Sequence, residues 1–272
     1  MQIRIKLLVI FIFLFLTSIS QENTYIYGSF ESNSQYLQDD EGLNFYSPSD
    51  NFRSNNYLKV DFQNGNFSYG IQYESYLPSA LLGYSEIFDN HDGIAQYYVK
   101  YENQNSEITV GSFYEQFGNG LIFRAWEDRQ LGINNSLRGI RYKFNPSKEV
   151  QISGIHGKQR FGFEYSNSVI SGIDSNIDIS GILKLNNLGF NLGLSNLNRY
   201  QKLNAGFGEP ENVQITGARL DLFYKDFYVN AELAKKSKDV IANEGEILSQ
   251  RKYDGTALQI DFGYSRKGLG IN

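Results

Sequence analysis

The chain has 272 residues, no Cys, two His and a formal net charge of −5. This length suits one domain, and the lack of Cys excludes a disulfide framework, a thiolate metal site and a lipid-modified N-terminal cysteine. The acidic balance argues against a nucleic-acid partner, because phosphate affinity depends on clustered Lys and Arg. The 20 Tyr and 20 Phe favour β-strands.

Residues 1–20 are predicted to be a cleaved secretory signal peptide. Arg4 and Lys6 give a positive start, an unbroken apolar run occupies 7–16, and small residues precede a cleavage site before Gln21. A membrane anchor is the alternative, but the apolar run is too short and no stop-transfer flank follows it. The mature domain would then be residues 21–272.

A first strand is expected at 24–31, followed by a polar loop over 32–55, and then by the clearest strand pair, at 57–63 and 67–74. Apolar and polar residues alternate in both runs, so each strand has one apolar and one polar face. Between them, Asn64-Gly65 supplies the positive backbone angles of a tight turn. We interpret this unit as a hairpin of an outer-membrane β-barrel, with its apolar face toward lipid and its polar face toward the lumen.

The rest of the chain repeats this pattern of strand pairs. Further strands are expected at 96–103, 107–113, 137–144, 148–156, 177–185, 188–196, 213–224, 227–235 and 256–265. Long connections are expected at 76–95, 114–136, 166–176, 197–212 and 236–255.

Residues 159–165 permit two interpretations. They form a strand of their own, or they continue the strand at 148–156 past a kink at Gly157. In the second case long and short connections alternate along the whole chain, as in a barrel with long loops outside the cell and tight turns in the periplasm. A soluble sandwich has no reason to sort its loops in this way. We therefore prefer one strand over 148–165, which gives about 12 strands, an even number.

The C-terminus does not look like the end of a finished barrel. Arg266, Lys267 and Gly268 predict another tight turn, and residues 269–272 resemble the start of a strand. An open sheet edge in lipid would leave costly unpaired backbone groups. We therefore expect an incomplete barrel whose chain continues beyond residue 272; the alternative is a short tail after a closed barrel.

The stretch 111–139 has too many turn residues and charges to face lipid, and it holds the only Trp, Trp126. We predict a loop that folds into the lumen and narrows a pore, where its charges set ion or solute selectivity. The alternative is a salt-bridged network that only holds the loop in place, since buried charges are usually paired whatever their function. The candidate lumen residues in or near this stretch are Glu115, Arg124, Glu127, Asp128, Arg129, Arg138 and Arg141.

The same stretch carries a family resemblance that spans most of the mature chain. The matching segments are Phe113-Tyr114-Glu115-Gln116-Phe117-Gly118 with Gly120-Leu121, Trp126-Glu127-Asp128-Arg129, Leu131-Gly132-Ile133-Asn134-Asn135, Gly157-Lys158-Gln159-Arg160 and Ser265-Arg266-Lys267-Gly268-Leu269-Gly270. With these segments the chain resembles the N-terminal part of an uncharacterised family of Bacteroidota outer-membrane proteins. The resemblance implies an outer-membrane barrel that continues past residue 272, and it implies no activity.

Catalytic chemistry finds little support. Ser153 and His156 are three residues apart, which places them on opposite faces of a regular strand, and His91-Asp92 is a common pair in a polar loop. The acidic run at 39–41 lacks the ligand spacing of a Ca²⁺ loop. We predict no enzymatic activity, no cofactor and no metal.

The predicted protein is therefore an antiparallel, all-β, transmembrane barrel of the Gram-negative cell outer membrane, reached through the cleaved signal peptide. The first function hypothesis is a porin-like passive channel for small solutes. The second is a structural or accessory barrel with a plugged lumen in a secretion or assembly complex, and the third is a secreted soluble β adhesin. The expected partners are outer-membrane lipid, the outer-membrane assembly machinery and small solutes, with no nucleic acid.

Overall fold

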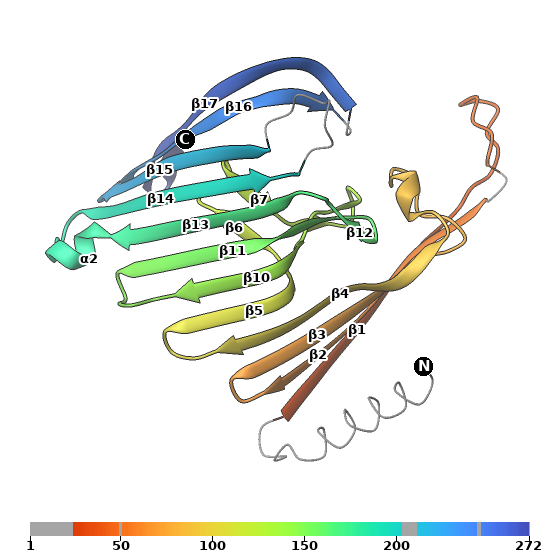
Figure 1. Cartoon of the computed structure of the whole chain (residues 1–272), viewed down its shortest axis with the longest axis horizontal. Helices are drawn as coiled ribbons and strands as arrows, with labels where there is room; N and C mark the ends of the chain where they lie inside the picture. The colour runs from red at the N-terminus through yellow and green to blue at the C-terminus, as the bar shows by residue number, and fades with distance from the viewer. Residues whose placement is uncertain (1–23, 49–50, 203–210, 244–245, 272) are drawn as a thin grey trace.

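One antiparallel sheet dominates the structure, a computed structural model that describes residues 24–48, 51–202, 211–243 and 246–271. The sheet has 14 strands, and it curls along its width (Figure 1). Its path is β1 (Thr24–Tyr36), β2 (Phe52–Asn64), β3 (Phe67–Tyr76), β4 (His91–Glu102), β5 (Ser106–Phe113), β10 (Leu137–Phe144), β11 (Val150–Phe161), β13 (Val169–Asp178), β14 (Gly189–Tyr200), β15 (Asn212–Tyr224), β16 (Phe227–Asn243), β17 (Glu246–Arg266) and β18 (Leu269–Ile271). Beside this path, β12 (Glu164–Tyr165) pairs with β11.

The predicted all-β antiparallel fold is confirmed, and each strand of the path pairs with its neighbour in sequence order. The edge strands β1 and β18 do not pair with each other within the described part of the chain. The sheet therefore has the form of an incomplete barrel. The expected signal peptide lies outside the described residues.

The hairpin of β2 and β3 shows why the sequence folds in this way. Val60 pairs with Ile71, so the apolar positions of both strands share one face. The turn is Gly65-Asn66, and Gly65 has φ of 53°, a conformation that costs a residue without Cβ little. The predicted pairing is confirmed, and of the predicted turn dipeptide it is Gly65 that supplies the positive φ.

Alternate connections lie at opposite ends of the strands, as sequential antiparallel pairing requires. One end, here called the tight-turn rim, has the connections 65–66, 103–105, 145–149, 179–188, 225–226 and 267–268. The other, here called the long-loop rim, has 37–51, 77–90, 114–136, 162–168, 201–211 and 244–245. The loop 77–90 contains the short helix η2 (Glu86–Phe88).

Of two polar stretches predicted as loops, 32–55 is strand at both ends and 236–255 is largely strand. β1 and β2 extend to Tyr36 and from Phe52, so the loop between them shrinks to 37–51. The predicted loop 236–255 is wrong, because β16 and β17 continue as a hairpin to Asn243 and Glu246. Backbone ladder bonds do not require an apolar face, so polar composition concealed both extensions.

The strand predicted at 177–185 is also wrong. β13 occupies Val169–Asp178, mostly within the predicted loop 166–176, and the helix α2 (Ile179–Leu183) follows it, so only 177–178 of the predicted strand are correct. Asp178 caps this helix, with its side chain accepting a hydrogen bond from the Gly181 N–H at 2.8 Å. Ser and Asn residues on β13 concealed the strand, and apolar residues on α2 suggested one.

The preferred single strand over 148–165 is right as far as Phe161. β11 passes through Gly157 without ending, then the chain reverses at Gly162, which has φ of 61°. Residues 164–165 return as β12 beside the end of β11.

The two faces of the sheet differ in a way that is unusual for a soluble protein. The inner face is defined here as the face against which residues 114–136 pack, and the outer face is the opposite one. On β3, Ile71 of the outer face is 39% exposed, whereas Gln72 and Glu74 of the inner face are 4% and 0% exposed. Polar groups are thus buried inside, and apolar groups are exposed outside.

Candidate functional site

The connection 114–136, here called the inner loop, folds as two small hairpins against the inner face. The first hairpin pairs β6 (Glu115–Phe117) with β7 (Phe123–Ala125), and the second pairs β8 (Glu127–Asp128) with β9 (Ile133–Asn134). Contacts of the first hairpin reach β13, β15 and β16, and contacts of the second reach β1 and β2. The loop therefore spans the inner face from one side of the sheet toward the other.

Glycines on the wall make room for the first hairpin. Phe117 is fully buried in an apolar cluster that includes Leu137. A Cβ added at Gly172 on β13 would lie 2.9 Å from the Phe117 ring, and one at Gly217 on β15 would lie 2.1 Å from the Ile122 Cδ1 atom. The hairpin thus approaches the strand backbone more closely than side chains would allow.

Charged wall residues hold the tip of the first hairpin. The Asn119 N–H donates to the Glu232 Oε2 atom at 2.9 Å, and Glu232 is fully buried. Beside it, Arg219 forms an ion pair with Asp174 at 2.8 Å and donates to the Ser195 hydroxyl at 2.6 Å. A Cβ at Gly118 would lie 2.1 Å from the Arg219 Cδ atom, so the tip rests directly on this paired arginine.

Two glycines of the tip allow a matched test of this contact. Gly118 and Gly120 have φ of 55° and 90°, so alanine costs backbone strain of about 1–2 kcal/mol at either position. The nearest neighbours of a Cβ at Gly120 lie 3.4 Å away, within the loop itself. We expect Gly118→Ala, but not Gly120→Ala, to release the tip and speed limited proteolysis of the loop in the folded protein. Equal cleavage of the two variants would contradict this contact.

The second hairpin is held by Arg129, whose guanidinium lies 4.1 Å from the centre of the Tyr57 ring. Arg129 pairs with Glu31 of β1 and, at 3.4 Å, with Glu127. Burial works against the charged form, but the Glu127 and Glu31 carboxylates outweigh it and raise the pKa of Arg129. The Tyr84 hydroxyl donates to the Arg129 carbonyl.

A separate ionic network lies at the base of the loop. Arg141 pairs with Glu107 and donates to the Tyr114 carbonyl at 2.7 Å. The Glu115 carboxylate lies 3.0 Å from the Lys143 ammonium and 3.7 Å from the Arg141 guanidinium. Most of the candidate residues are thus tied to the fold by paired charges.

Arg124 differs from the other candidates. Its pair across the hairpin is Gln116, and both side chains are exposed, whereas the neighbouring Ala125 is buried. The Arg124 guanidinium lies 4.2 Å from the centre of the Trp126 ring, and no described carboxylate forms an ion pair with it. Among the candidates within the inner loop, Arg124 is therefore the cation available to a solute.

The two remaining candidates serve other contacts. Asp128 accepts the backbone N–H groups of Gln130 and Leu131 at 2.9 and 3.1 Å, which closes the turn of the second hairpin. Arg138 shares the outer face of β10 with Ile140, and its guanidinium lies 3.7 Å from the centre of the Tyr165 ring. The seven predicted residues therefore occupy several places and do not form one cluster.

Sequence reasoning missed the most buried ion pair in the described residues, between Glu74 and Arg160. Both side chains are 1% exposed, and the two guanidinium nitrogens donate to the two carboxylate oxygens at 2.9 and 2.6 Å. The Tyr76 hydroxyl and the Gln72 amide also donate to Glu74. Glu74 is the last of the alternating polar residues predicted on β3, but no sequence signal pointed to its partner Arg160, which lies 86 residues away.

The structure does not bring Ser153 and His156 together as a catalytic pair. The His156 Nδ1 atom lies 2.8 Å from the Ser171 hydroxyl, whereas Ser153 contacts Glu115 on the inner face. Among the described residues, no group of three or more His, Asp or Glu side chains is placed to hold a metal ion. No helix in the described ranges is long and apolar enough to cross a membrane.

The fold and the site define an all-β protein with one curled antiparallel sheet, whose polar inner face is partly covered by its own loop. The chain belongs to a family of unknown function, DUF6029, whose model matches residues 1–272. No curated protein matches the sequence.

Several solved outer-membrane structures are similar to the chain at low identity. OccK2 (OpdF) of Pseudomonas aeruginosa in complex with glucuronate is 11% identical with a TM-score of 0.37, and the match covers 80% of this chain and 64% of that one. OccAB3 of Acinetobacter baumannii is 11% identical over 90% and 76% of the two chains, with a TM-score of 0.40. A BenF-like porin of Pseudomonas fluorescens Pf-5 is 10% identical over 89% and 76%, also with 0.40. At these values the likeness carries no functional argument.

Proposed function

We propose that the protein is a β-barrel of the Gram-negative outer membrane and acts as a porin-like passive channel, with the inner loop as its constriction. The supporting observation is the inverted polarity of the sheet. Glu74, Arg160 and Glu232 are buried on the inner side, while large apolar side chains cover the outer face. Soluble proteins rarely expose apolar surface over a whole sheet, but lipid requires it.

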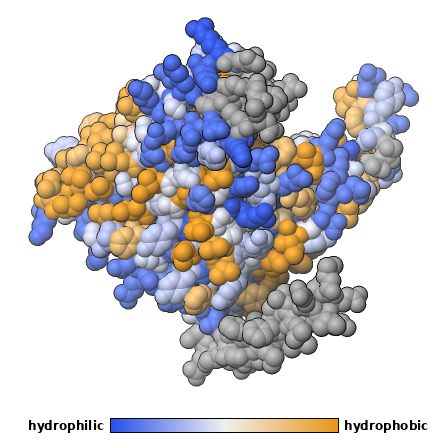
Figure 2. All heavy atoms as spheres, viewed as in Figure 1, coloured by the Kyte–Doolittle hydropathy of each residue, from blue (hydrophilic) through white to orange (hydrophobic). Residues whose placement is uncertain are grey.

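The outer face also has the aromatic band that such barrels place at the membrane interface. Outward-facing rings gather toward the tight-turn rim, with Phe67 and Tyr101 5.0 Å apart and Phe227 and Tyr264 4.8 Å apart. Figure 2 shows apolar side chains gathered over α2 and the adjoining strand ends. On α2 Ile182 is 51% exposed, so this rim also presents apolar surface to lipid.

The orientation follows from the loops. Outer-membrane barrels place short turns in the periplasm and longer loops outside the cell. The inner loop then enters the lumen from the outside, in the position of a constriction. Lipid and the outer-membrane assembly machinery are the expected partners, and small solutes are the expected cargo.

The structure separates two arginines that the sequence treats alike, and this gives a test of the constriction. One unpaired charge acting through about 10 Å of water contributes about 0.4 kcal/mol, with opposite sign for an anion and a cation, or about a fourfold change in their permeability ratio. We expect Arg124→Gln to lower the chloride-to-potassium permeability ratio about fourfold, measured as a reversal potential in planar bilayers under a KCl gradient.

Arg129→Gln combined with Glu127→Gln is the matched control, because it removes one cation and one of its paired carboxylates together and leaves the net charge of the loop unchanged. We expect this variant to lower thermal stability and leave selectivity little changed. Unchanged selectivity in Arg124→Gln would argue that the network only holds the loop in place.

A barrel with a plugged lumen, serving a secretion or assembly complex, is the second candidate. The observation in its favour is the apolar cluster on the inner face, where Phe117 and Leu137 are fully buried. Open-channel steps in planar bilayers support the porin, and their absence supports the plug. Recovery of the protein in the soluble fraction, without heat-modifiable migration on detergent gels, would favour the secreted adhesin over both.

A further inference from the structure

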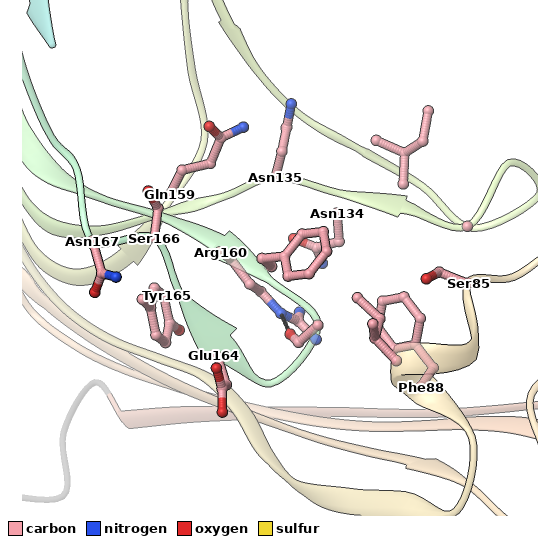
Figure 3. A pocket seen from close by; sticks show the side chains of 15 residues that line it. Ser85, Phe88, Asn134, Asn135, Gln159, Arg160, Glu164, Tyr165, Ser166 and Asn167 are labelled. Atoms are coloured by element: carbon pink, nitrogen blue, oxygen red, sulfur yellow. Dashed lines mark hydrogen bonds between the residues drawn. The ribbon is translucent and has the colours of Figure 1, made fainter. Parts of the chain in front are cut away.

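We propose that a cavity at the long-loop rim is a binding site for a neutral, polyhydroxylated solute such as an oligosaccharide. The cavity has a volume of about 620 Å³, within the range of ligand pockets. In Figure 3, Gln159, Tyr165 and Asn167 line one side and Ser85 and Phe88 face them from the other. Three separate parts of the chain thus form its walls.

Amide side chains supply the polar surface of this cavity. The Gln159 and Asn167 side chains make no hydrogen bond to any other described residue, although both line the cavity. The Asn135 Oδ1 atom accepts a hydrogen bond from the backbone N–H of Trp126 at 2.6 Å, and its Nδ2 atom donates a long bond of 3.4 Å to the Arg124 carbonyl. An amide donates and accepts in one plane, which matches the neighbouring hydroxyls of a sugar ring.

An exposed aromatic ring also lines the cavity. Phe161 is one of the lining residues and is 65% exposed. The apolar face of a pyranose can cover such a ring, because its C–H groups are attracted to the negative face of the π-system. Amides together with an exposed ring fit a solute with one polar edge and one apolar face.

The charges of the cavity favour a neutral solute over an organic acid. Arg160 lines it, but its guanidinium is used by both oxygens of Glu74 and by the Gly162 carbonyl at 2.6 Å. Glu164 is exposed and forms no ion pair within the described ranges. The Arg138 guanidinium, 3.7 Å from the centre of the Tyr165 ring, also forms no ion pair within the described ranges, so the site has no net charge that would attract carboxylates or phosphates.

This inference extends the proposed channel by naming a solute class, and it depends on the proposed function only for the side from which the solute arrives. The test uses the full chain in detergent, with maltotriose as the probe and calorimetry and Trp126 fluorescence as readouts. Trp126 is the only Trp, and its backbone pairs with Asn135 of the cavity wall. Binding can therefore be measured whether or not the lumen conducts.

We expect maltotriose to bind and to change the Trp126 emission. Gln159→Leu and Asn167→Leu should each weaken binding about tenfold, because each removes hydrogen bonds to the ligand and none to the fold. Gln151→Leu is the matched control, since Gln151 is an exposed amide on the same strand near the opposite rim. It should bind as the parent does.

Absence of a heat of binding with millimolar maltotriose would overturn the proposal, as would equal losses in Gln159→Leu and Gln151→Leu. Binding of trialanine in place of maltotriose would overturn the ligand class. Ion conductance that persists without maltotriose binding would leave the channel standing while removing the site, so the two failures can be told apart.

Discussion

Glu74→Gln is expected to lower the free energy of unfolding by about 3–5 kcal/mol, because it leaves the Arg160 guanidinium buried without its counter-ion. Both side chains are 1% exposed, so water cannot replace the lost partner. The measurement is urea unfolding of the barrel in lipid vesicles, followed by Trp126 fluorescence. The effect should be among the largest of any single substitution outside the apolar cluster.

The pair matters because of where it lies. Glu74 belongs to β3 and Arg160 to the end of β11, and in the sheet β4, β5 and β10 separate these strands. β5 ends at Phe113 and β10 begins at Leu137, so the chain leaves the wall there as the inner loop. The β11–β12 hairpin reaches β4 at this level, where the Tyr165 hydroxyl donates to the Ala95 carbonyl at 3.3 Å. The ion pair thus connects β3 with β11 at the level where β5 and β10, which lie between them, do not extend.

Two controls separate this role from a general effect of charge. Removing both partners, as in Glu74→Gln with Arg160→Met, should recover part of the loss, because no uncompensated charge remains. Lys59→Gln breaks a more exposed ion pair with Asp61 and should cost less than about 1 kcal/mol. Equal losses of unfolding free energy in Glu74→Gln and Lys59→Gln would show that the buried ion pair stabilises the fold no more than the exposed pair does.

Arginine on the outer face is expected to impair membrane insertion and to cost about 2–4 kcal/mol at mid-membrane. Ile71 is 39% exposed and lies four residues from the tight turn, about 13 Å along the strand, near the middle of the apolar band. Val60 is its direct cross-strand partner and should behave alike. The measurement is the heat-modifiable fraction after folding into lipid vesicles.

The control must be as exposed as the test position and lie on the inner face. Gln72 does not qualify, because it is 4% exposed and donates to Glu74, so arginine there would fail for lack of space. Ile260 and Asp261 on β17 form the better pair. Ile260 is 55% exposed on the outer face, and Asp261 is exposed beside it on the inner face. If Ile260→Arg and Asp261→Arg insert equally well, the outer face does not contact lipid.

Period-two alternation was enough to predict most of the sheet. It placed the β2–β3 hairpin on the right faces, gave the bounds of β10, and found the turn at Lys225-Asp226. The alternation gave wrong predictions where the polarity of a segment does not match its secondary structure. Polar residues form the extension of β16 and β17, and the apolar residues after Asp178 form a helix whose cap is a local hydrogen bond.

The sequence predicted which segment forms the candidate site, but not which partners its charged side chains have. The charges and turn residues of 114–136 marked a loop unsuited to lipid, and the structure packs it on the inner face. The sequence could not distinguish Arg124, which has no carboxylate partner in the described part, from Arg129, which has two. Those partners come from distant strands as well as from the loop itself.

The sequence by itself determined the fold class, the apolar face of each strand and the segment that covers the inner face, because these depend on local periodicity and composition. Only the tertiary structure decided which charges meet, where Glu74 finds Arg160, and how the wall glycines admit Phe117 and Ile122. The physical reason is that strand register and sheet curvature, which are set by the whole chain, decide which side chains share a small volume far from bulk water.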